Sequence, residues 1–352
     1  MPQSAAIAPI KTPRSSRSRE DTRVLIALSE QERRLFFSEK SLQGHPGIEH
    51  ADMRGAGRET WNRLLKKVQP TVLITGWSTP ALDTAQLLYA GGSIDYVCHV
   101  AGSVRHIISL EHIEAGLKVT NWGMLIAPQV AEHALLTLLA LMRNLGLWRD
   151  AMMAPPESLH RERLATRTLH GKTVAIHGFG MIARELIRLL RPFNVRVRAF
   201  SAGVPDSFIR QHQATPVSSL AQLAEHADVF VTCEALTPAT TKSINAEVLS
   251  KLPEGAVFVN VGRGAVVDEA ALIDAAKTRS LRVGSDVFTH EPLAHDSALF
   301  QLPGAILSPH IAGPAFDTFG DCGRQALANV DNYLAGKPLT GLITPEIFAR
   351  ST

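Results

Sequence analysis

Three short polar segments in the C-terminal half of the chain carry the residues with the clearest chemistry. They are Asn-Val-Gly-Arg-Gly at 260–264, Asp-Val-Phe-Thr-His-Glu-Pro-Leu at 286–293 and Ser-Pro-His-Ile-Ala-Gly at 308–313. Each belongs to or follows a short apolar run typical of a strand, and ligands of open α/β sheets bind at the carboxyl ends of strands. We therefore expect Arg263, Glu291 and His310 to converge, where they could bind an anion and move a proton.

Each of these residues also has an interpretation without chemistry. Arg263 alone is typical of a surface ion pair, and His310 alone of a hydrogen-bonded core histidine. Glu291 alone is typical of a turn before Pro292. Their order, each after a strand, favours the joint functional interpretation.

The segment around residue 178 has the pattern of a dinucleotide-binding loop. Val-Ala-Ile-His at 174–177 reads as a strand, Gly-Phe-Gly-Met-Ile-Ala follows at 178–183, and a helical pattern comes next. Gly178 permits a tight turn, and Gly180 lets a pyrophosphate approach the helix N-terminus. Met181 and Ile182 complete the predicted loop. The alternative is a strand–helix turn whose small residues serve packing alone.

A serine occupies the position at which the dinucleotide-binding fingerprint expects a ribose-binding acid. The fingerprint expects a carboxylate near the end of the second strand, read here at 195–199, and the sequence has Ser201. A serine does not repel a 2′-phosphate as a carboxylate would. The sequence therefore leaves both NAD and NADP open and favours NADP.

Apolar runs alternate with helical patterns along the chain, which predicts an α/β fold with doubly wound parallel sheets. The predicted strands lie at 24–28, 72–75, 94–98, 174–177, 195–199, 229–232, 257–261, 281–287 and 305–308. The predicted helices lie at 128–147, 181–190, 219–226, 269–278 and 316–334.

The three polar segments and the glycine loop together resemble the D-isomer-specific 2-hydroxyacid dehydrogenase family, over roughly residues 70–335. The resemblance implies that Arg263 binds the substrate carboxylate, that His310 exchanges a proton with the substrate oxygen, and that Glu291 orients the histidine. It implies that Asp286 holds the nicotinamide. Further cofactor contacts are implied for Ser201, Glu234, Val261, Gly262, Arg263, His310, Ala312 and Gly313, and substrate contacts for Ala101, Gly102, Ser103, Arg263 and His310.

The resemblance also implies an interrupted domain arrangement. A Rossmann NAD(P)-binding domain at 122–314 would be inserted into a flavodoxin-like substrate domain made of 23–121 and 315–352. A tail at 1–22 would precede both. The family's habit of pairing through the cofactor domain implies a homodimer.

Several positions depart from the family pattern and leave the substrate open. In the substrate loop, Ser103 replaces a glycine, and Arg105 replaces an aspartate and either meets a second anionic group or points to solvent. Trp77 and Trp122 either wall the pocket or pack at the domain interface. Glu234, beside the cofactor, is expected to use its backbone. A glutamate at 291 argues against formate dehydrogenase, whose relatives carry glutamine there.

Composition excludes several classes of protein. The formal net charge is +3, but residues 1–19 contain four basic residues and no acid, so the remainder is nearly neutral and lacks a nucleic-acid footprint. No stretch reaches the roughly 20 apolar residues of a membrane span. Three scattered cysteines predict no zinc site or other metal centre and a reducing, cytoplasmic location, although the Arg/Ser-rich start is also typical of organelle import.

Three functions fit these observations. The preferred one is a reductase of a small 2-oxo acid such as glyoxylate or hydroxypyruvate. The second is oxidation of a non-carbon acid, as in phosphite dehydrogenases, which share the same three residues. The third is a cofactor-sensing binding protein, as in the co-repressors of the family.

Overall fold

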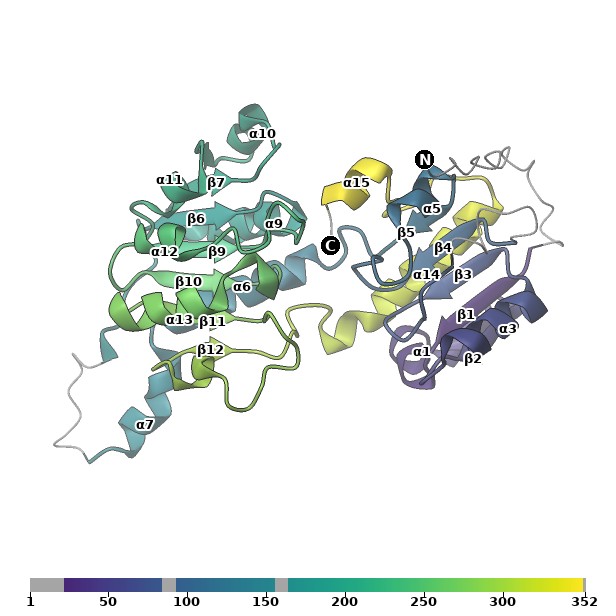
Figure 1. The fold of residues 1–352 in the computed structure, drawn as a ribbon, viewed down its shortest axis with the longest axis horizontal. Helices are drawn as coiled ribbons and strands as arrows, with labels where there is room; N and C mark the ends of the chain where they lie inside the picture. Colours follow the sequence, from purple (N-terminus) through teal and green to yellow (C-terminus); the bar gives the residue numbers. More distant parts are fainter. Residues whose placement is uncertain (1–21, 84–92, 156–163, 351–352) are drawn as a thin grey trace, which may run out of the picture. The chain divides into compact units, whose positions relative to one another are not determined.

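The chain divides into two compact α/β units. In the computed structural model, residues 22–83, 93–155 and 164–350 are described. One unit comprises the described parts of Met1–Leu125 and Phe316–Thr352, and the other comprises Ile126–Ala315 (Figure 1). The sequence places the corresponding breaks after residues 121 and 314. The predicted tail lies, apart from Thr22, outside the described residues.

The central unit is built on a seven-stranded parallel sheet with the order β8-β7-β6-β9-β10-β11-β12. This is the strand order of the doubly wound dinucleotide-binding fold, extended by one strand. The strands are β6 (Thr173–His177), β7 (Arg196–Phe200), β8 (Thr215–Pro216), β9 (Val229–Thr232), β10 (Val257–Asn260), β11 (Arg282–Ser285) and β12 (Ile306–Leu307).

Helices cover both faces of this sheet, which explains why its inner strands are apolar on both sides. On one face Leu138 and Leu186 pack with Ile176, and on the other the rings of Phe230 and Phe258 stack with centroids 5.7 Å apart. The helices are α6 (Ala127–Met142), α7 (Trp148–Met153), α9 (Met181–Leu190), α10 (Asp206–Gln211), α11 (Leu220–Ala224), α12 (Ala246–Ser250) and α13 (Glu269–Thr278), with short 3-10 turns η2 (Leu145–Leu147), η4 (Arg191–Phe193), η5 (Gly264–Val266) and η6 (Ala298–Gln301).

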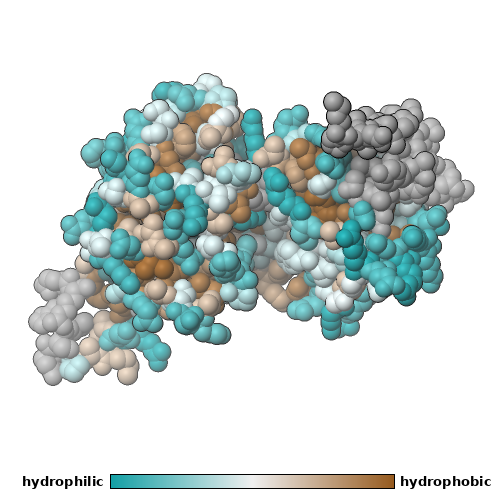
Figure 2. Space-filling view, viewed as in Figure 1, coloured by the Kyte–Doolittle hydropathy of each residue, from teal (hydrophilic) through white to brown (hydrophobic). Residues whose placement is uncertain are grey.

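The terminal unit has a five-stranded parallel sheet with the order β2-β1-β3-β4-β5, the flavodoxin order. Its strands are β1 (Val24–Leu28), β2 (Ile48–Asp52), β3 (Val72–Thr75), β4 (Tyr96–His99) and β5 (Lys118–Thr120). Its helical elements are α1 (Glu30–Phe36), α2 (Glu39–Gln43), α3 (Arg58–Val68), α5 (Leu110–Glu114), η7 (Phe316–Thr318), α14 (Phe319–Leu334) and α15 (Pro345–Arg350). Helix α3 buries Trp61 and Leu65 and presents a hydrophilic outer surface (Figure 2).

The structure confirms the predicted α/β class and most predicted strands, and it adds three that the sequence does not signal. Strand β2 has a mostly exposed pattern with polar residues, because it lies at the edge of its sheet. Strands β5 and β8 contain three and two residues. Their residues, Lys-Val-Thr and Thr-Pro, form no apolar run, so hydrophobic periodicity cannot reveal them.

Across the part of the chain that the structure describes, no single helix is long and apolar enough to span a membrane. Two consecutive helical segments, Ala127–Met142 and Leu145–Met153, reach the length and apolar composition of a span when they are taken together. They are bent by 56° relative to each other, and the criterion concerns length and composition only.

Candidate active site

His310 and Glu291 form a hydrogen-bonded pair at the carboxyl edge of the central sheet. The His310 Nδ1 lies 2.6 Å from Oε2 of Glu291, whose Oε1 accepts a 2.9 Å bond from the backbone N–H of Phe288. The imidazole Nε2 has no hydrogen-bond partner among the described residues. Both side chains line an open pocket of about 540 Å³ whose walls also include Phe288 and Phe300. The carboxylate thus holds one ring nitrogen and leaves the other for chemistry.

The backbone of His310 is held in an unusual conformation by Asp286. Its φ is +54°, in the left-handed region that costs a residue with a Cβ about 1–3 kcal/mol and persists only where surrounding contacts enforce it. The His310 N–H donates to the backbone oxygen of Asp286 at 2.8 Å. The Asp286 carboxylate accepts 2.9 Å bonds from the N–H groups of Ile311 and Ala312. Asp286 therefore builds the turn that presents the histidine.

Asp286 is held further by two partly buried polar side chains. Ser308 donates its hydroxyl proton to Oδ1 of Asp286 at 2.6 Å, so its oxygen is free to accept from Nε2 of His133 at 2.9 Å. The sequence alone assigned no role to Ser308 or His133; the signal available was a histidine directly before the apolar run at 134–142. The predicted contact of Asp286 with the nicotinamide remains a prediction.

Arg263 follows β10 and is positioned by Asn260. The Asn260 Oδ1 accepts from the N–H of Gly262 at 3.0 Å, and its Nδ2 donates to the carbonyl of Arg263 at 3.3 Å. Burial lowers the pKa of Arg263, whereas the negative charge of Glu291 acts to raise it. Arginine remains charged under such conditions. The structure therefore brings a guanidinium into the electrostatic range of the His310–Glu291 pair.

Gly264 fits a space that no other residue can occupy, and we expect Gly264→Ala to destabilise the protein. A Cβ at this position would lie 1.9 Å from the backbone carbonyl carbon of Phe288, which cannot move aside as a side chain can. Overpacking of this kind costs typically about 1–3 kcal/mol. Urea unfolding would measure the loss, with Gly44→Ala as the control because a Cβ there meets only an ordinary 3.8 Å contact. Equal stabilities for the two variants would contradict this packing.

The glycine loop has the properties that a dinucleotide requires. Gly178 has a φ of +90°, and a Cβ at Gly180 would have no atom within 4 Å, so the backbone there is open to a ligand. Helix α9 begins at Met181 without a side-chain cap, which leaves its first N–H groups for another acceptor. The side chain of Met181 is exposed, whereas that of Ile182 packs against the core. Only the backbone of Ile182 could therefore contact a bound dinucleotide.

Of the remaining predicted cofactor residues, Glu234 lies against Gly178 of this loop and is also close to Gly262. The hydroxyl of Ser201 donates to Oε2 of Glu234 at 2.9 Å, so the Glu234 side chain is held at the end of β7, and the expected backbone contact of Glu234 with the cofactor stays a prediction. Val261 and Gly262 are buried after β10. Ala312 and Gly313 follow the His310 turn.

The predicted substrate loop belongs to the terminal unit and follows β4. The indole ring of Trp122 lies against Gly102, where a Cβ would approach it to 2.5 Å. The side chain of Asn121 donates to the Gly102 carbonyl at 2.7 Å. These contacts shape the loop that contains Ala101 and Ser103, whose contact with substrate remains a prediction.

Two further residues of this unit that depart from the family pattern have partners within it. Arg105 is exposed, and its guanidinium also donates to the carbonyl of Phe348 and lies 4.4 Å over that residue's ring, because the C-terminal helix α15 returns to this loop. Trp77 packs in an aromatic group with Phe36 and Phe319, at centroid distances of 5.5 and 6.2 Å.

Comparison with known proteins identifies the family. The model for the NAD-binding domain of D-isomer-specific 2-hydroxyacid dehydrogenases matches residues 135–312, about half of the chain. The chain belongs to the D-isomer-specific 2-hydroxyacid dehydrogenase family. Its relatives include glyoxylate reductase from Pyrococcus furiosus, 28% identical over 278 residues that cover 76% of this chain and 79% of the relative. D-3-phosphoglycerate dehydrogenase from Mycobacterium tuberculosis is 32% identical, covering 78% and 52%.

Solved structures agree on the fold of this 2-hydroxyacid dehydrogenase. A glyoxylate reductase from Paecilomyes thermophila matches with a TM-score of 0.74 at 23% identity, covering 91% of this chain and 98% of the other. The TT0316 protein of Thermus thermophilus matches with 0.71 at 26% identity, covering 92% and 100%. The predicted family, fold class and NAD(P)-dependent oxidoreductase activity on CH–OH donors are thereby confirmed.

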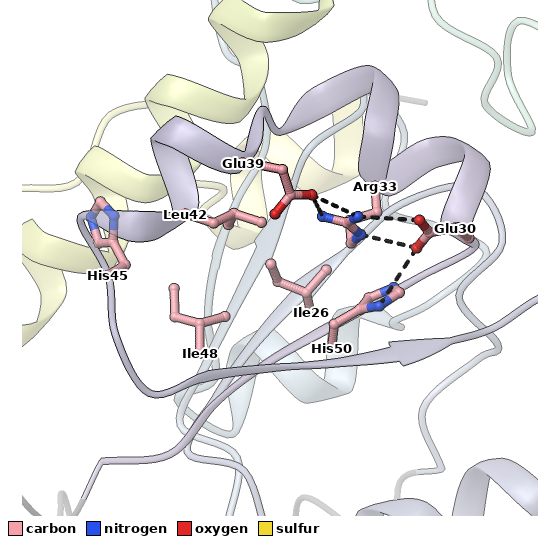
Figure 3. A pocket seen from close by; sticks show the side chains of 8 residues that line it. All are labelled: Ile26, Glu30, Arg33, Glu39, Leu42, His45, Ile48 and His50. Atoms are coloured by element: carbon pink, nitrogen blue, oxygen red, sulfur yellow. Dashed lines mark hydrogen bonds and ion pairs between the residues drawn. The ribbon is translucent and has the colours of Figure 1, made fainter.

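The dehydrogenase has a second cavity, of about 250 Å³, in its terminal unit (Figure 3). Arg33 projects between Glu30 and Glu39 and bonds both carboxylates at 3.0 Å, while His50 faces Glu30 from β2 (Figure 3). The ion pairs of Arg33 join α1 and α2, and the His50 contact adds β2. Elsewhere too, no three His, Cys, Asp or Glu side chains in the described ranges are grouped to hold a metal ion.

Protonation of Glu30 is expected to weaken this cluster in acid. Hydrogen bonds from Arg33 and Arg34 lower the pKa of Glu30 to about 2. In the unfolded chain the pKa of a glutamate is about 4.3. The stabilisation that the ionised Glu30 gives the folded state is therefore complete above that pH and is lost as the pH falls towards 2. Glu30→Gln should lower the melting temperature by no more than a few degrees near neutral pH, because exposed pairs contribute little. Thermal unfolding of both proteins at descending pH should show this difference closing, and a constant difference would count against the ion pair.

Proposed function

We propose that this dehydrogenase reduces a small 2-oxo acid of the glyoxylate and hydroxypyruvate type with NADH or NADPH. The observation that carries the proposal is the 2.6 Å pair of His310 and Glu291 with the half-buried Arg263 near it. Relatives named glyoxylate reductase and hydroxypyruvate reductase, at 28% and 27% identity, support the choice among 2-oxo acids.

The three residues have separate tasks in this reaction. The guanidinium of Arg263 binds the substrate carboxylate through paired N–H groups and draws charge towards the oxo group. As the carbonyl oxygen becomes negative, Nε2 of His310 gives it a proton. Glu291 accepts from Nδ1, which fixes the tautomer with the proton on that nitrogen and stabilises the imidazolium. In the direction of oxidation, His310 removes the proton from the hydroxyl group.

A nicotinamide dinucleotide fits the residues that would hold it. The pyrophosphate would lie on the open backbone at Gly180 and the uncapped start of α9. When bound, the nicotinamide supplies or accepts the hydride. Residues after β10 and after β12 would line the same edge, so the protein's part is to orient the acid and control one proton.

Two alternatives make different predictions. A phosphite-type dehydrogenase would use the same three residues but oxidise a non-carbon acid. A cofactor-sensing binding protein would bind the dinucleotide and turn over no acid. The geometry of the His310–Glu291 pair favours an enzyme over a sensor, because a sensor has no use for an oriented proton donor.

The test is a panel of 2-oxo acids, including glyoxylate, hydroxypyruvate, phenylpyruvate and phosphohydroxypyruvate, with NADH and NADPH, and phosphite with the oxidised cofactors. We expect the highest kcat/KM with the two smallest 2-oxo acids. Turnover confined to phosphite would replace the proposal by the second function. Tight cofactor binding without turnover of any acid would replace it by the third.

We further propose that the enzyme is a homodimer formed through its central unit. Large apolar side chains project from the arm made by α6 and α7: Leu136 is 60% exposed, and Met152 and Met153 are each 80% exposed. Exposed apolar side chains that gather into a patch often mark a protein–protein interface. Light scattering on the full chain should give twice the chain mass, and a monomer at micromolar concentration would exclude the dimer.

A further inference from the structure

The ends of three adjacent strands meet at the first glycine of the dinucleotide loop. Strand β6 lies between β7 and β9 in the sheet, and Gly178 follows β6 directly. Ser201 follows β7, and Glu234 comes two residues after β9. In a dinucleotide-binding fold this edge faces the adenosine half of the cofactor.

Glu234 reaches Ser201 by crossing over Gly178. A Cβ at Gly178 would lie 2.7 Å from both N and Cα of Glu234, so glycine alone leaves room for this backbone. The hydroxyl of Ser201 then donates to Oε2 of Glu234 at 2.9 Å, and the backbone N–H of Ala235 donates to Oε1 at 3.0 Å. Two donors on different segments hold the carboxylate at the end of the second strand.

The charge of this carboxylate is not balanced by its neighbours. Its only basic neighbour among the described residues, Nε2 of His177, lies 3.8 Å away, and burial lowers the pKa of that histidine to about 4, so the ring is neutral at pH 7. Arg198 on β7 is occupied with the backbone carbonyls of Gln222 and Glu225. Within the described ranges, no lysine or arginine forms an ion pair with Glu234. The side chain is 14% exposed, so one edge of it reaches the surface.

We infer that Glu234 binds the adenosine ribose hydroxyls and makes the enzyme select NAD over NADP. The fingerprint acid normally comes from the second strand, where it accepts hydrogen bonds from the ribose. Here the second strand supplies Ser201, and the acid comes from the loop after β9. A carboxylate accepts from hydroxyl groups, and it repels a 2′-phosphate at short range. This inference rests on the proposed use of a nicotinamide dinucleotide, and it reverses the preference for NADP that Ser201 alone suggests.

The test measures dissociation constants of NADH and NADPH for the full chain without any substrate, by quenching of tryptophan fluorescence. The unmodified enzyme should bind NADH at least about tenfold more tightly than NADPH. Glu234→Gln keeps an oxygen for Ser201 and removes the charge, so its NADPH dissociation constant should fall about tenfold and the preference should largely disappear. Ser201→Ala should reduce the preference less, because Ala235 still holds the carboxylate.

The matched control is Glu225→Gln, which removes an exposed carboxylate just before β9, at the opposite end of that strand, and should leave the ratio unchanged. If Glu234→Gln does not fold, as judged by its thermal unfolding, Ser201→Ala decides the question. Equal affinity of the unmodified enzyme for both cofactors would overturn the inference, as would an equal change in both affinities in Glu234→Gln. The binding measurement contains no acid substrate, so a failure of the proposed reaction would not affect its result. Turnover of a 2-oxo acid by an enzyme that binds NADH and NADPH equally well would refute only the inference about Glu234.

Discussion

Replacement of His310 by alanine is expected to lower kcat by a factor of about 10²–10⁴, the range that general acid catalysis by a positioned side chain contributes. The substrate oxygen would lose its proton donor at the moment when it becomes negative. Cofactor affinity should change little, because the glycine loop and α9 do not depend on this side chain. Steady-state kinetics with the best 2-oxo acid, together with NADH titration, would measure both effects.

Two further variants make this expectation specific. Glu291→Gln keeps an oxygen that can accept from Nδ1 at the observed 2.6 Å but removes the charge that stabilises the imidazolium, so its loss should be smaller than that of His310→Ala. His170→Ala, an exposed histidine before β6, should retain full activity. Activity of His310→Ala within a few-fold of the unmodified enzyme would mean that the proton comes from another group.

Replacement of Arg263 by lysine is expected to lower kcat/KM by roughly 100-fold or more, even though the positive charge is retained. An ammonium group cannot form the paired bonds of a guanidinium with a carboxylate, and each bond to a charged group contributes about 1.5–3 kcal/mol. The loss should appear mainly as a higher KM for the acid. Saturation kinetics in the acid at fixed cofactor concentration would separate KM from kcat.

The control for Arg263 is Arg210→Lys, because that arginine is well exposed on α10 and pairs only loosely with Asp206 at 3.8 Å. Its kinetics should match those of the unmodified enzyme. An Arg263→Lys enzyme with an unchanged KM would mean that the carboxylate is bound elsewhere, and the N–H groups of the loop at 101–103 would then be the next candidates.

The sequence predicts helices and strands well where the burial of one or both faces produces a recognisable pattern of apolar residues. Helices α9 and α13 have the predicted bounds, and the inner strands of the central sheet appear as continuous apolar runs because both faces are covered. The edge strand β2 is missed because its exposed faces permit polar residues. The local hydrophobic pattern therefore indicates burial, and it gives no signal where an element is short or lies at the edge of a sheet.

The sequence also predicts those parts of the site in which a function depends on one residue type at one position. Arg263, Glu291 and His310 each follow a strand, so their convergence at the carboxyl edge is a consequence of parallel topology. The glycine at 178 is likewise required by a positive φ that local geometry imposes. For these residues type and order suffice, since a parallel sheet gathers strand ends at one edge.

Only the tertiary structure shows the relations between residues far apart in the sequence. Asp286 caps the turn at Ile311 and Ala312, Arg105 binds Phe348, and Glu234 crosses Gly178 to reach Ser201. Such contacts depend on which loops the folded sheet brings side by side and on the side-chain directions there, and no local pattern encodes either. The sequence by itself thus predicted the class of reaction and three candidate residues, whereas the folded arrangement of loops decided how the histidine is held and which groups hold the Glu234 carboxylate.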